Sequence, residues 1–227
     1  MFTLSVIGQK GGSGKTTVAL GLAVAAARAG EAVVVLDLDP QTNAANWKDR
    51  RQTENPLVLS IQASRLRQTA ETARSNGANL LIIDTPGKSE SAAIDAARLS
   101  DLVLVPSRPQ VFDMETLPTV RNLIRAAGDP PAFVLYNFIH PQGNRQAEEL
   151  KELTLAHAGF EACPVHLTQR ISHSEAQAQG QAPQEIEPDG KAAAELEQLY
   201  KFIRSRVNMS ESEHHGEKQS GHAKKRA

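Results

Sequence analysis

The stretch GQKGGSGKTT at residues 8–17 constrains the fold of this chain more than any other feature. It follows a short apolar run at 3–8 and precedes TTVALGLAVAAARAG at 16–30, which has the composition of a helix that ends at Gly30. A glycine-rich loop between a buried strand and a helix is typical of phosphate binding, because backbone N–H groups and the positive end of the helix dipole converge on an anion. The alternative, a glycine-rich turn without a ligand, is disfavoured by this placement.

The loop departs from the common pattern G-x-x-x-x-G-K-[ST], because Gln9 occupies the first glycine position. We expect Lys15 to reach the β- and γ-phosphates of a nucleotide and the Thr16 hydroxyl to bind Mg²⁺. Lys10 stands at the start of the loop, where its side chain can point toward a facing molecule. A cation supplied across an interface stabilises charge on the γ-phosphate, so a second lysine predicts a site completed by two chains. A solvated surface lysine is the alternative that the residues leave open.

Apolar runs of strand length alternate with helical segments along the chain. The runs lie at 3–8, 32–39, 57–61, 79–87, 101–107, 132–138 and 165–168, and the helical segments at 16–30, 64–77, 91–100, 114–128 and 145–159. Continuous Val, Ile and Leu runs separated by helices indicate parallel strands buried on both faces. We therefore predict a single α/β domain with a doubly wound, mostly parallel sheet flanked by helices.

The C-terminal part is predicted to contain a closing helix at 192–207, whose apolar residues share one face. They are Leu196, Leu199, Tyr200, Ile203 and Val207. Residues 208–227 are almost free of apolar side chains, which predicts a disordered polar tail. The expected division is a nucleotide-binding domain at 1–207 followed by this tail.

Composition excludes several classes of protein. With a formal net charge of −1 and 4% aromatic residues, a nucleic-acid surface would have to be a local basic patch without base stacking. Cys163 is the only cysteine, so neither an internal disulfide nor a cysteine metal site is expected, and a cytosolic setting fits. The sequence has no secretion signal and no apolar run of about 20 residues, so no membrane partner is expected.

Three aspartates follow apolar runs, where the carboxyl ends of parallel strands would place them beside the phosphate loop. Asp37 and Asp39 lie two residues apart and so share one face of the chain. Two such acids near a metal–nucleotide complex can divide the work between the metal's waters and the attacking water. Asp84 is expected to hold Mg²⁺ through a water. A helix N-cap or turn role is the alternative, and for Asp37 it is a fair competitor.

Several segments together resemble the ParA/MinD ATPases. KGGSGKTT is similar to their deviant Walker A motif, and the other similar segments are LDLDPQTNAANW at 36–47, LLIIDTPG at 80–87, LVPSRPQVFDMET at 104–116 and the stretch 168–199. The likeness is greatest to small plasmid-partition ParA proteins that lack an N-terminal DNA-reading domain. It runs from Phe2 to about Val207. The chain departs from the family at Gly8, where Asn is frequent, and at Thr42, where a small residue is usual.

The resemblance implies a P-loop NTPase fold of the deviant Walker A type and Mg²⁺-dependent ATP hydrolysis. The implied catalytic residues are Lys10, Lys15 and Asp39, with Asp39 on the water. The implied nucleotide-binding residues are Gly11, Gly12, Ser13, Gly14, Lys15, Thr16, Thr17, Pro106, Pro109 and Asn137, with the two prolines forming a wall of the base pocket and Asn137 bonding adenine. The implied metal-site residues are Thr16, Asp37 and Asp84. For Asn137 an ordinary turn residue is the alternative.

The resemblance also implies an ATP-dependent homodimer that binds DNA without sequence preference, associates with the nucleoid and segregates plasmid or chromosomal DNA with a ParB-like adaptor. The implied DNA contacts are Arg170, Lys201, Arg204 and Arg206, each with a solvated charge as its alternative. A ParA-like positioner of another cargo, such as a carboxysome or a chemoreceptor cluster, stays open. So does a MinD-like regulator at a membrane surface, although the last 18 residues lack Leu, Ile, Val and Phe. A cluster-bridging electron donor of this fold is excluded, because it needs two cysteines.

Overall fold

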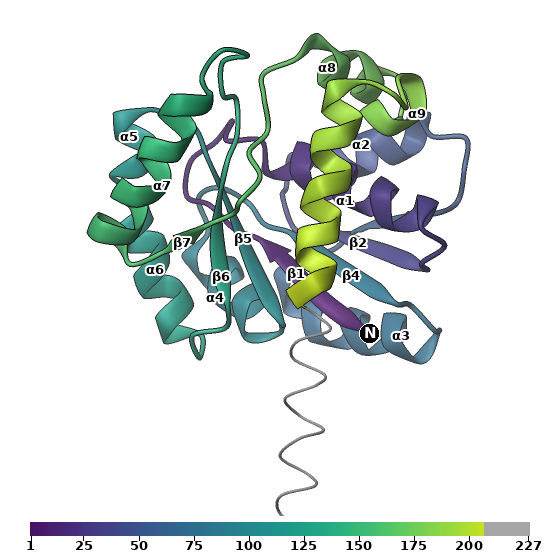
Figure 1. Cartoon of the computed structure of the whole chain (residues 1–227). Helices are drawn as coiled ribbons and strands as arrows, with labels where there is room; N and C mark the ends of the chain where they lie inside the picture. The colour runs from purple at the N-terminus through teal and green to yellow at the C-terminus, as the bar shows by residue number, and fades with distance from the viewer. Residues whose placement is uncertain (207–227) are drawn as a thin grey trace, which may run out of the picture.

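A parallel sheet forms the centre of the computed structural model, which describes residues 1–206 (Figure 1). Within these residues the sheet has seven strands in the order β3-β2-β4-β1-β5-β6-β7, and every strand pair is parallel. The strands are β1 (Phe2–Val6), β2 (Val33–Asp37), β3 (Leu57–Ser60), β4 (Leu80–Asp84), β5 (Leu102–Ser107), β6 (Ala132–Tyr136) and β7 (Glu161–Ala162). β1, β2, β4 and β5 are buried at every residue, as their apolar runs predict.

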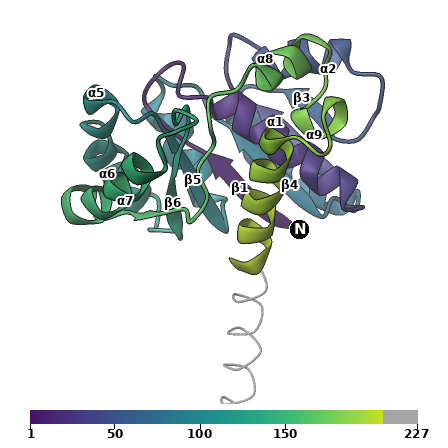
Figure 2. The same ribbon diagram turned by 45° about the horizontal axis from the view of Figure 1, so that its top comes forward.

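Helices cover both faces of the sheet, which confirms the predicted doubly wound architecture (Figure 2). The helices are α1 (Lys15–Arg28), α2 (Asn43–Arg50), α3 (Leu66–Ser75), α4 (Glu90–Arg98), α5 (Val111–Met114), α6 (Leu117–Ala126), α7 (Asn144–Ala158), α8 (Ile171–Ala178), α9 (Pro183–Ile186), the 3₁₀ turn η1 (Ala63–Arg65) and a last helix over 191–206. α1 and the last helix share one apolar cluster with the sheet, whereas α3, α4, α6 and α7 share the other.

The strand predicted at 165–168 is wrong, because the structure places β7 at Glu161–Ala162 instead. The later residues make only an isolated bridge between Ile139 and Thr168. The N–H of Cys163 donates to Val134 and that of Leu167 donates to Tyr136. A step of four residues, from Cys163 to Leu167, therefore spans a step of only two residues on β6, from Val134 to Tyr136. The extra residues between Cys163 and Leu167 cannot pair with β6, so the regular pairing of β7 ends at Ala162.

The last helix packs on the core through the apolar face that its sequence predicts. Leu196, Leu199 and Ile203 are all buried in the cluster that contains α1. A Cβ on Gly21 of α1 would lie 2.7 Å from Leu196 Cδ2, so a glycine is needed for this close approach of the two helices. Val207 and the predicted tail lie outside the described residues, and the C-terminal domain boundary stays a prediction.

Candidate functional site

The phosphate loop leaves the carboxyl end of β1, between the neighbouring strands β4 and β5, and enters α1. Gly12 and Gly14 have φ angles of 74° and 88°, in the left-handed region that favours glycine. A Cβ on Gly14 would also lie 2.1 Å from Asn137 Nδ2, so any other residue there would displace the Asn137 side chain as well as strain the backbone. Gly14 precedes α1 without a side-chain cap, which leaves the first N–H groups of the helix for another acceptor. The predicted loop, Gly11 to Thr17, therefore has the geometry of an anion-binding loop.

Lys15 is folded into this loop. Its side chain is 7% exposed, and Nζ donates to the Lys10 carbonyl oxygen at 2.9 Å. Burial lowers the pKa of Lys15, while Asp84 and Asp39 act in the opposite direction. A partly desolvated ammonium beside two carboxylates interacts strongly with an anion that reaches the loop.

The Lys10 carbonyl is engaged within the loop, whereas its side-chain amine is not. Its carbonyl is taken by Lys15, whereas its amine makes no hydrogen bond or ion pair with any described residue. The residue is half-buried at the edge of the loop. Its predicted role in the nucleotide site of a second chain stays a prediction.

Thr16 and Asp84 form the part of the site that suits a divalent cation. Thr16 Oγ1 donates to Asp84 Oδ2 at 2.6 Å, and Asp84 is 1% exposed. The other oxygen, Oδ1, is buried and accepts no hydrogen bond from a described residue, and burial raises the pKa of Asp84 to about 7. A buried carboxylate oxygen next to a hydroxyl matches the hard oxygen ligands of Mg²⁺. No group of three or more His, Cys, Asp or Glu side chains with metal-binding geometry occurs in residues 1–206, so water and phosphate oxygens would complete such a shell.

Asp37 caps α2 in this structure. Oδ1 accepts from the N–H of Asp39 at 3.0 Å, and Oδ2 accepts from Ala44 at 3.0 Å and Ala45 at 3.3 Å. Burial raises the pKa of Asp37 while these backbone donors lower it. Asp37 therefore has the helix-capping role that the sequence left open, because its two carboxylate oxygens accept hydrogen bonds from the start of α2 and from Asp39 before it. The metal-shell role of Asp37 stays a prediction.

Asp39 has a different environment at the edge of a cleft of about 930 Å³. Oδ1 accepts from the N–H of Gln41 at 3.0 Å, whereas Oδ2 bonds to no described residue. The same cleft is lined by Gly11 of the phosphate loop and by Gly87 and Lys88 after β4. A half-buried carboxylate with one unengaged oxygen beside the phosphate loop is placed to orient a water molecule.

A second cleft, of about 540 Å³, lies on the other side of the loop. Its lining residues include Thr17, Asn137, Phe138, Thr168, Gln169, Arg170, His173 and Gln177. The Asn137 side chain is occupied locally, because Nδ2 donates to Ser13 at 3.0 Å and Oδ1 accepts from Phe138 at 2.8 Å. Gln177 Nε2 donates to Thr17 Oγ1 at 2.7 Å and so links the cleft wall to α1. Contact between Asn137 and adenine stays a prediction.

The two prolines predicted for the base pocket are not among the residues that line this second cleft. Pro106 belongs to β5 and lines a hollow of about 10 Å³ with Gly8 and Ser13, while Pro109 is half-buried in the following loop. The sequence patterns did not predict that residues within 168–177 line a cleft beside the phosphate loop, because this segment lies far along the chain. The motif at 168–199 was the available signal.

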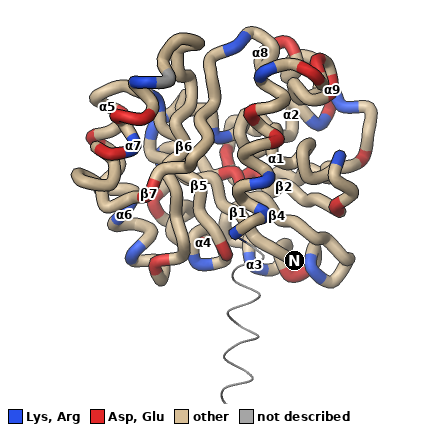
Figure 3. The backbone as a smooth tube through the Cα atoms, in the orientation of Figure 1, with Lys and Arg blue, Asp and Glu red and all other residues tan. Residues whose placement is uncertain are grey.

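The four predicted DNA contacts are not gathered in one patch. Arg170 is paired with Glu195 at 2.9 Å, and Arg204 with Glu31 at 3.3 Å. Arg206 lies over two aromatic rings, and Lys201 is exposed on the last helix. Eleven residues of helix separate Glu195 from Arg206, which is about 16 Å along the axis. Figure 3 shows acidic residues interspersed with basic ones, so a continuous basic face is not seen in that view. DNA contact by these residues stays a prediction.

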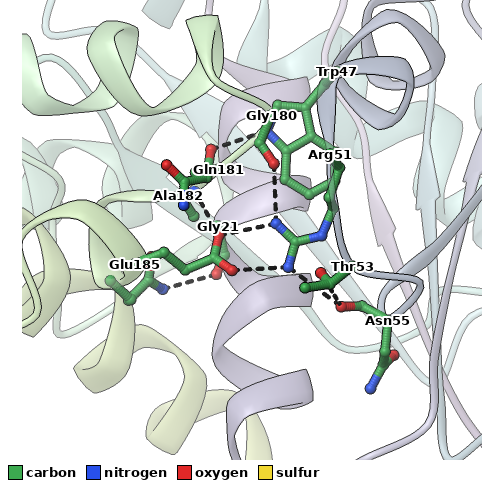
Figure 4. A network of polar contacts seen from close by, with 10 residues as sticks. Gly21, Trp47, Arg51, Thr53, Asn55, Gly180, Gln181, Ala182 and Glu185 are labelled. Carbon is green, nitrogen blue, oxygen red and sulfur yellow. Dashed lines mark hydrogen bonds and ion pairs between the residues drawn. The ribbon is translucent and has the colours of Figure 1, made fainter.

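A buried network joins the end of α2 to the segment between α8 and α9 (Figure 4). Arg51 donates to both carboxylate oxygens of Glu185 at 2.9 Å and to the Gly180 carbonyl at 3.0 Å. Its guanidinium lies 4.7 Å from the ring centre of Trp47, whose indole N–H donates to the Gln181 carbonyl at 2.9 Å. The helix that Asp37 caps is therefore fixed at its far end to the C-terminal part of the fold.

The parallel sheet, the glycine loop and the carboxylates at the strand ends define a P-loop nucleotide-binding protein of the deviant Walker A type. Residues 4–183 match the family model of the CobQ/CobB/MinD/ParA nucleotide binding domain. The chain belongs to this family of P-loop ATPases, which confirms the resemblance to ParA and MinD. No helix within the described residues is both long and apolar enough to cross a bilayer.

Two bacterial proteins are similar to this chain in sequence. The chain is 30% identical over 202 residues to the maintenance of carboxysome distribution protein A of Gloeobacter kilaueensis, covering 88% of this chain and 91% of that protein. It is 26% identical over 220 residues to the chromosome partitioning protein ParA of Caulobacter vibrioides, covering 76% of this chain and 82% of that protein.

Solved structures share the fold at lower identity. The cell division protein MinD of Aquifex aeolicus has a TM-score of 0.72 and 15% identity, covering 90% of this chain and 98% of that one. The septum site-determining protein MinD of Pyrococcus horikoshii, solved with Mg-ADP, has a TM-score of 0.70 and 15% identity, covering 89% of this chain and 95% of that one.

Proposed function

We propose that this protein is a Mg²⁺-dependent ATPase whose nucleotide state controls dimerisation and DNA binding. The observation that carries the proposal is the phosphate loop itself. Lys15 is buried in the loop, Asp84 at the end of β4 accepts a hydrogen bond from Thr16, and the half-buried carboxylate of Asp39 lines a cleft with Gly11 of the loop. The related MinD structure solved with Mg-ADP supports the choice of an adenine nucleotide with magnesium.

The chain's own residues divide the work in this proposal. The loop N–H groups and Lys15 bind the β- and γ-phosphates, and Lys15 leaves the Lys10 carbonyl to do so. Thr16 and Asp84 hold the metal, which supplies Lewis-acid stabilisation of the phosphoryl oxygens. Asp39 orients the attacking water through its unengaged oxygen. The Lys10 amine, which has no partner within the described residues, enters the site of a second copy.

The dimer is proposed to bind DNA without sequence preference, to associate with the nucleoid and to be released by an adaptor that stimulates hydrolysis. Support comes from the relatives named for chromosome partitioning and from the proposed trans role of Lys10. Segregation of plasmid or chromosomal DNA with a ParB-like adaptor is the first candidate. The relative named for carboxysome distribution, which matches 88% of this chain, favours a second candidate in which the cargo is a protein assembly.

ATP hydrolysis and binding test the site directly. We expect Lys15→Ala to lose ATP binding, and Asp39→Ala to bind ATP while hydrolysing it at least about a hundredfold more slowly. The exposed residues Lys191 and Asp49 provide matched controls, since Lys191→Ala and Asp49→Ala should behave as wild type. Undiminished ATP binding by Lys15→Ala would refute the proposed site, and undiminished hydrolysis by Asp39→Ala would refute the role of that carboxylate.

Nucleotide-gated association is tested by light scattering and by gel shift on DNA of unrelated sequence. We expect a dimer and a DNA complex with ATP, but neither with ADP nor without nucleotide, and the affinity should fall steeply with salt because the contacts are to phosphates. Lys10→Ala should remain a monomer with ATP. A Lys10→Ala protein that dimerises fully would contradict the trans-acting lysine.

Deletion of the gene separates the two cargo candidates. Under the first, cells without the gene should lose a plasmid or missegregate their chromosome more often. Under the second, DNA inheritance should be normal while a protein assembly loses its even spacing. The adaptor encoded beside the gene provides an independent check, because a centromere-binding protein is expected only under the first candidate.

A further inference from the structure

The segment after β5 packs directly on the phosphate loop, although the established motif does not include it. Lys10 and Ser13 of the loop, Ser107 at the end of β5, and Asp113 and Thr116 of this segment line a hollow of only about 10 Å³. β5 pairs with β1 in the sheet, so the two loops leave its carboxyl edge side by side. Side chains of this segment can therefore lie beside the phosphate loop.

Arg108 is fixed there by a buried carboxylate. Its Nε donates to Asp113 Oδ2 at 2.6 Å, and its Nη2 donates to Asp113 Oδ1 at 3.3 Å. Asp113 is 3% exposed, and its position is set by the short helix α5. A two-point contact between a guanidinium and a carboxylate fixes the orientation as well as the position of the arginine. The hydrogen bond to Asp113 also raises the pKa of Arg108, so the charge is permanent.

The third guanidinium nitrogen, Nη1, lies near Gly12 of the phosphate loop. It is 4.0 Å from the point that a Cβ on Gly12 would occupy, and no described residue accepts a hydrogen bond from it. Gly12 is in the left-handed region, at the turn that aims the N–H groups of the loop. The guanidinium is therefore near this turn with one nitrogen uncommitted, while its other two nitrogens are paired with Asp113.

We propose that Arg108, oriented by Asp113, is a positioning residue of the phosphate site. It holds the turn at Gly11 and Gly12 in the phosphate-binding shape and strengthens the attraction of the loop for a polyphosphate. This inference rests on the proposed nucleotide-binding function. It adds to that function a cation outside the loop motif, Arg108, that contributes to the affinity for the phosphates.

Calorimetric binding of Mg²⁺·ATP tests the inference. We expect Arg108→Ala to weaken binding about tenfold, as for the loss of a contact to a charged group, and Arg108→Lys to restore part of the affinity by restoring the charge. Inorganic tripolyphosphate, used as a competitor, should lose affinity by the same factor, because it has only the phosphates. The matched control is Arg121→Ala. Arg121 is also paired with an aspartate, Asp129, and lines neither of the two clefts beside the loop nor the hollow.

The outcomes separate the inference from the function on which it rests. Arg108→Ala with wild-type affinity would overturn the inference while ATP binding by the wild type leaves the proposed function intact. A wild-type protein that binds no ATP would overturn both. Equal weakening by Arg121→Ala would also overturn it, because the effect would then be general destabilisation. If Arg108→Ala fails to fold, Arg108→Lys decides: a melting temperature near that of the wild type with about threefold weaker tripolyphosphate binding supports the inference, and undiminished binding overturns it.

Discussion

Replacing Asp84 with asparagine should stabilise the nucleotide-free protein at pH 8. Burial raises the pKa of Asp84 from 3.8 to about 7, so at pH 8 the fold holds an ionised carboxylate against desolvation. Because a tenfold change in an ionisation equilibrium is worth about 1.4 kcal/mol, this rise corresponds to about 4 kcal/mol. Asparagine keeps the shape, and its carbonyl oxygen can still accept the hydrogen bond that Thr16 donates.

The effect should depend on pH with a definite sign. Between pH 3.8 and about 7 the folded protein binds a proton at Asp84 that the unfolded chain releases. The stability contributed by this group is therefore complete below pH 3.8 and is lost as the pH rises through about 7. At about pH 5 less than half of this has been lost, so the gain from Asp84→Asn should increase by about 3 kcal/mol between about pH 5 and 8.

Urea unfolding of the two proteins at both pH values measures this difference. Asp95→Asn serves as a control for an exposed carboxylate and should change stability by less than about 0.5 kcal/mol at either pH. Mg²⁺·ATP should then stabilise the wild type, by about 2.7 kcal/mol at a hundredfold excess over Kd, and should lose this effect with Asp84→Asn. An equal gain at both pH values, or a less stable variant at pH 8, would refute the reasoning.

Two further predictions concern the loop and the network of Figure 4. Gly14→Ala places a Cβ 2.1 Å from Asn137 Nδ2 at a φ of 88°, so it should cost at least about 1–2 kcal/mol in thermal melts and abolish ATP binding measured by calorimetry. Wild-type binding would contradict the close fit. Arg51→Ala removes a side chain that is 4% exposed and leaves the Glu185 carboxylate, on a side chain that is 18% exposed, without its ion-pair partner, so it should cost about 3–5 kcal/mol in urea unfolding. Arg145→Ala, which breaks a pair that is 92% exposed on the arginine side, should cost less than about 0.5 kcal/mol; similar costs for both would show that burial is not the cause.

Much of the fold follows from local patterns in the sequence. The central strands are predicted by continuous apolar runs, and the first helix by its glycine loop, because such patterns depend on neighbours within a few residues. The position of Asp39 and Asp84 beside the phosphate loop follows equally directly, since the carboxyl ends of parallel strands meet at one edge. The strand predicted at 165–168 is wrong because the interruption of strand pairing between Cys163 and Leu167 depends on how this segment lies against β6, which no local pattern encodes.

The sequence by itself determined the α/β class, the phosphate loop and its two lysines, because these depend on residue type and spacing along the chain. Only the tertiary structure decided which side chains are occupied by partners: Asp37 by α2, Arg170 by Glu195, and Arg108 by Asp113 against Gly12. Such pairs depend on the register of strands and on the angles at which loops leave the sheet. The residue types along the chain do not encode these in any short pattern.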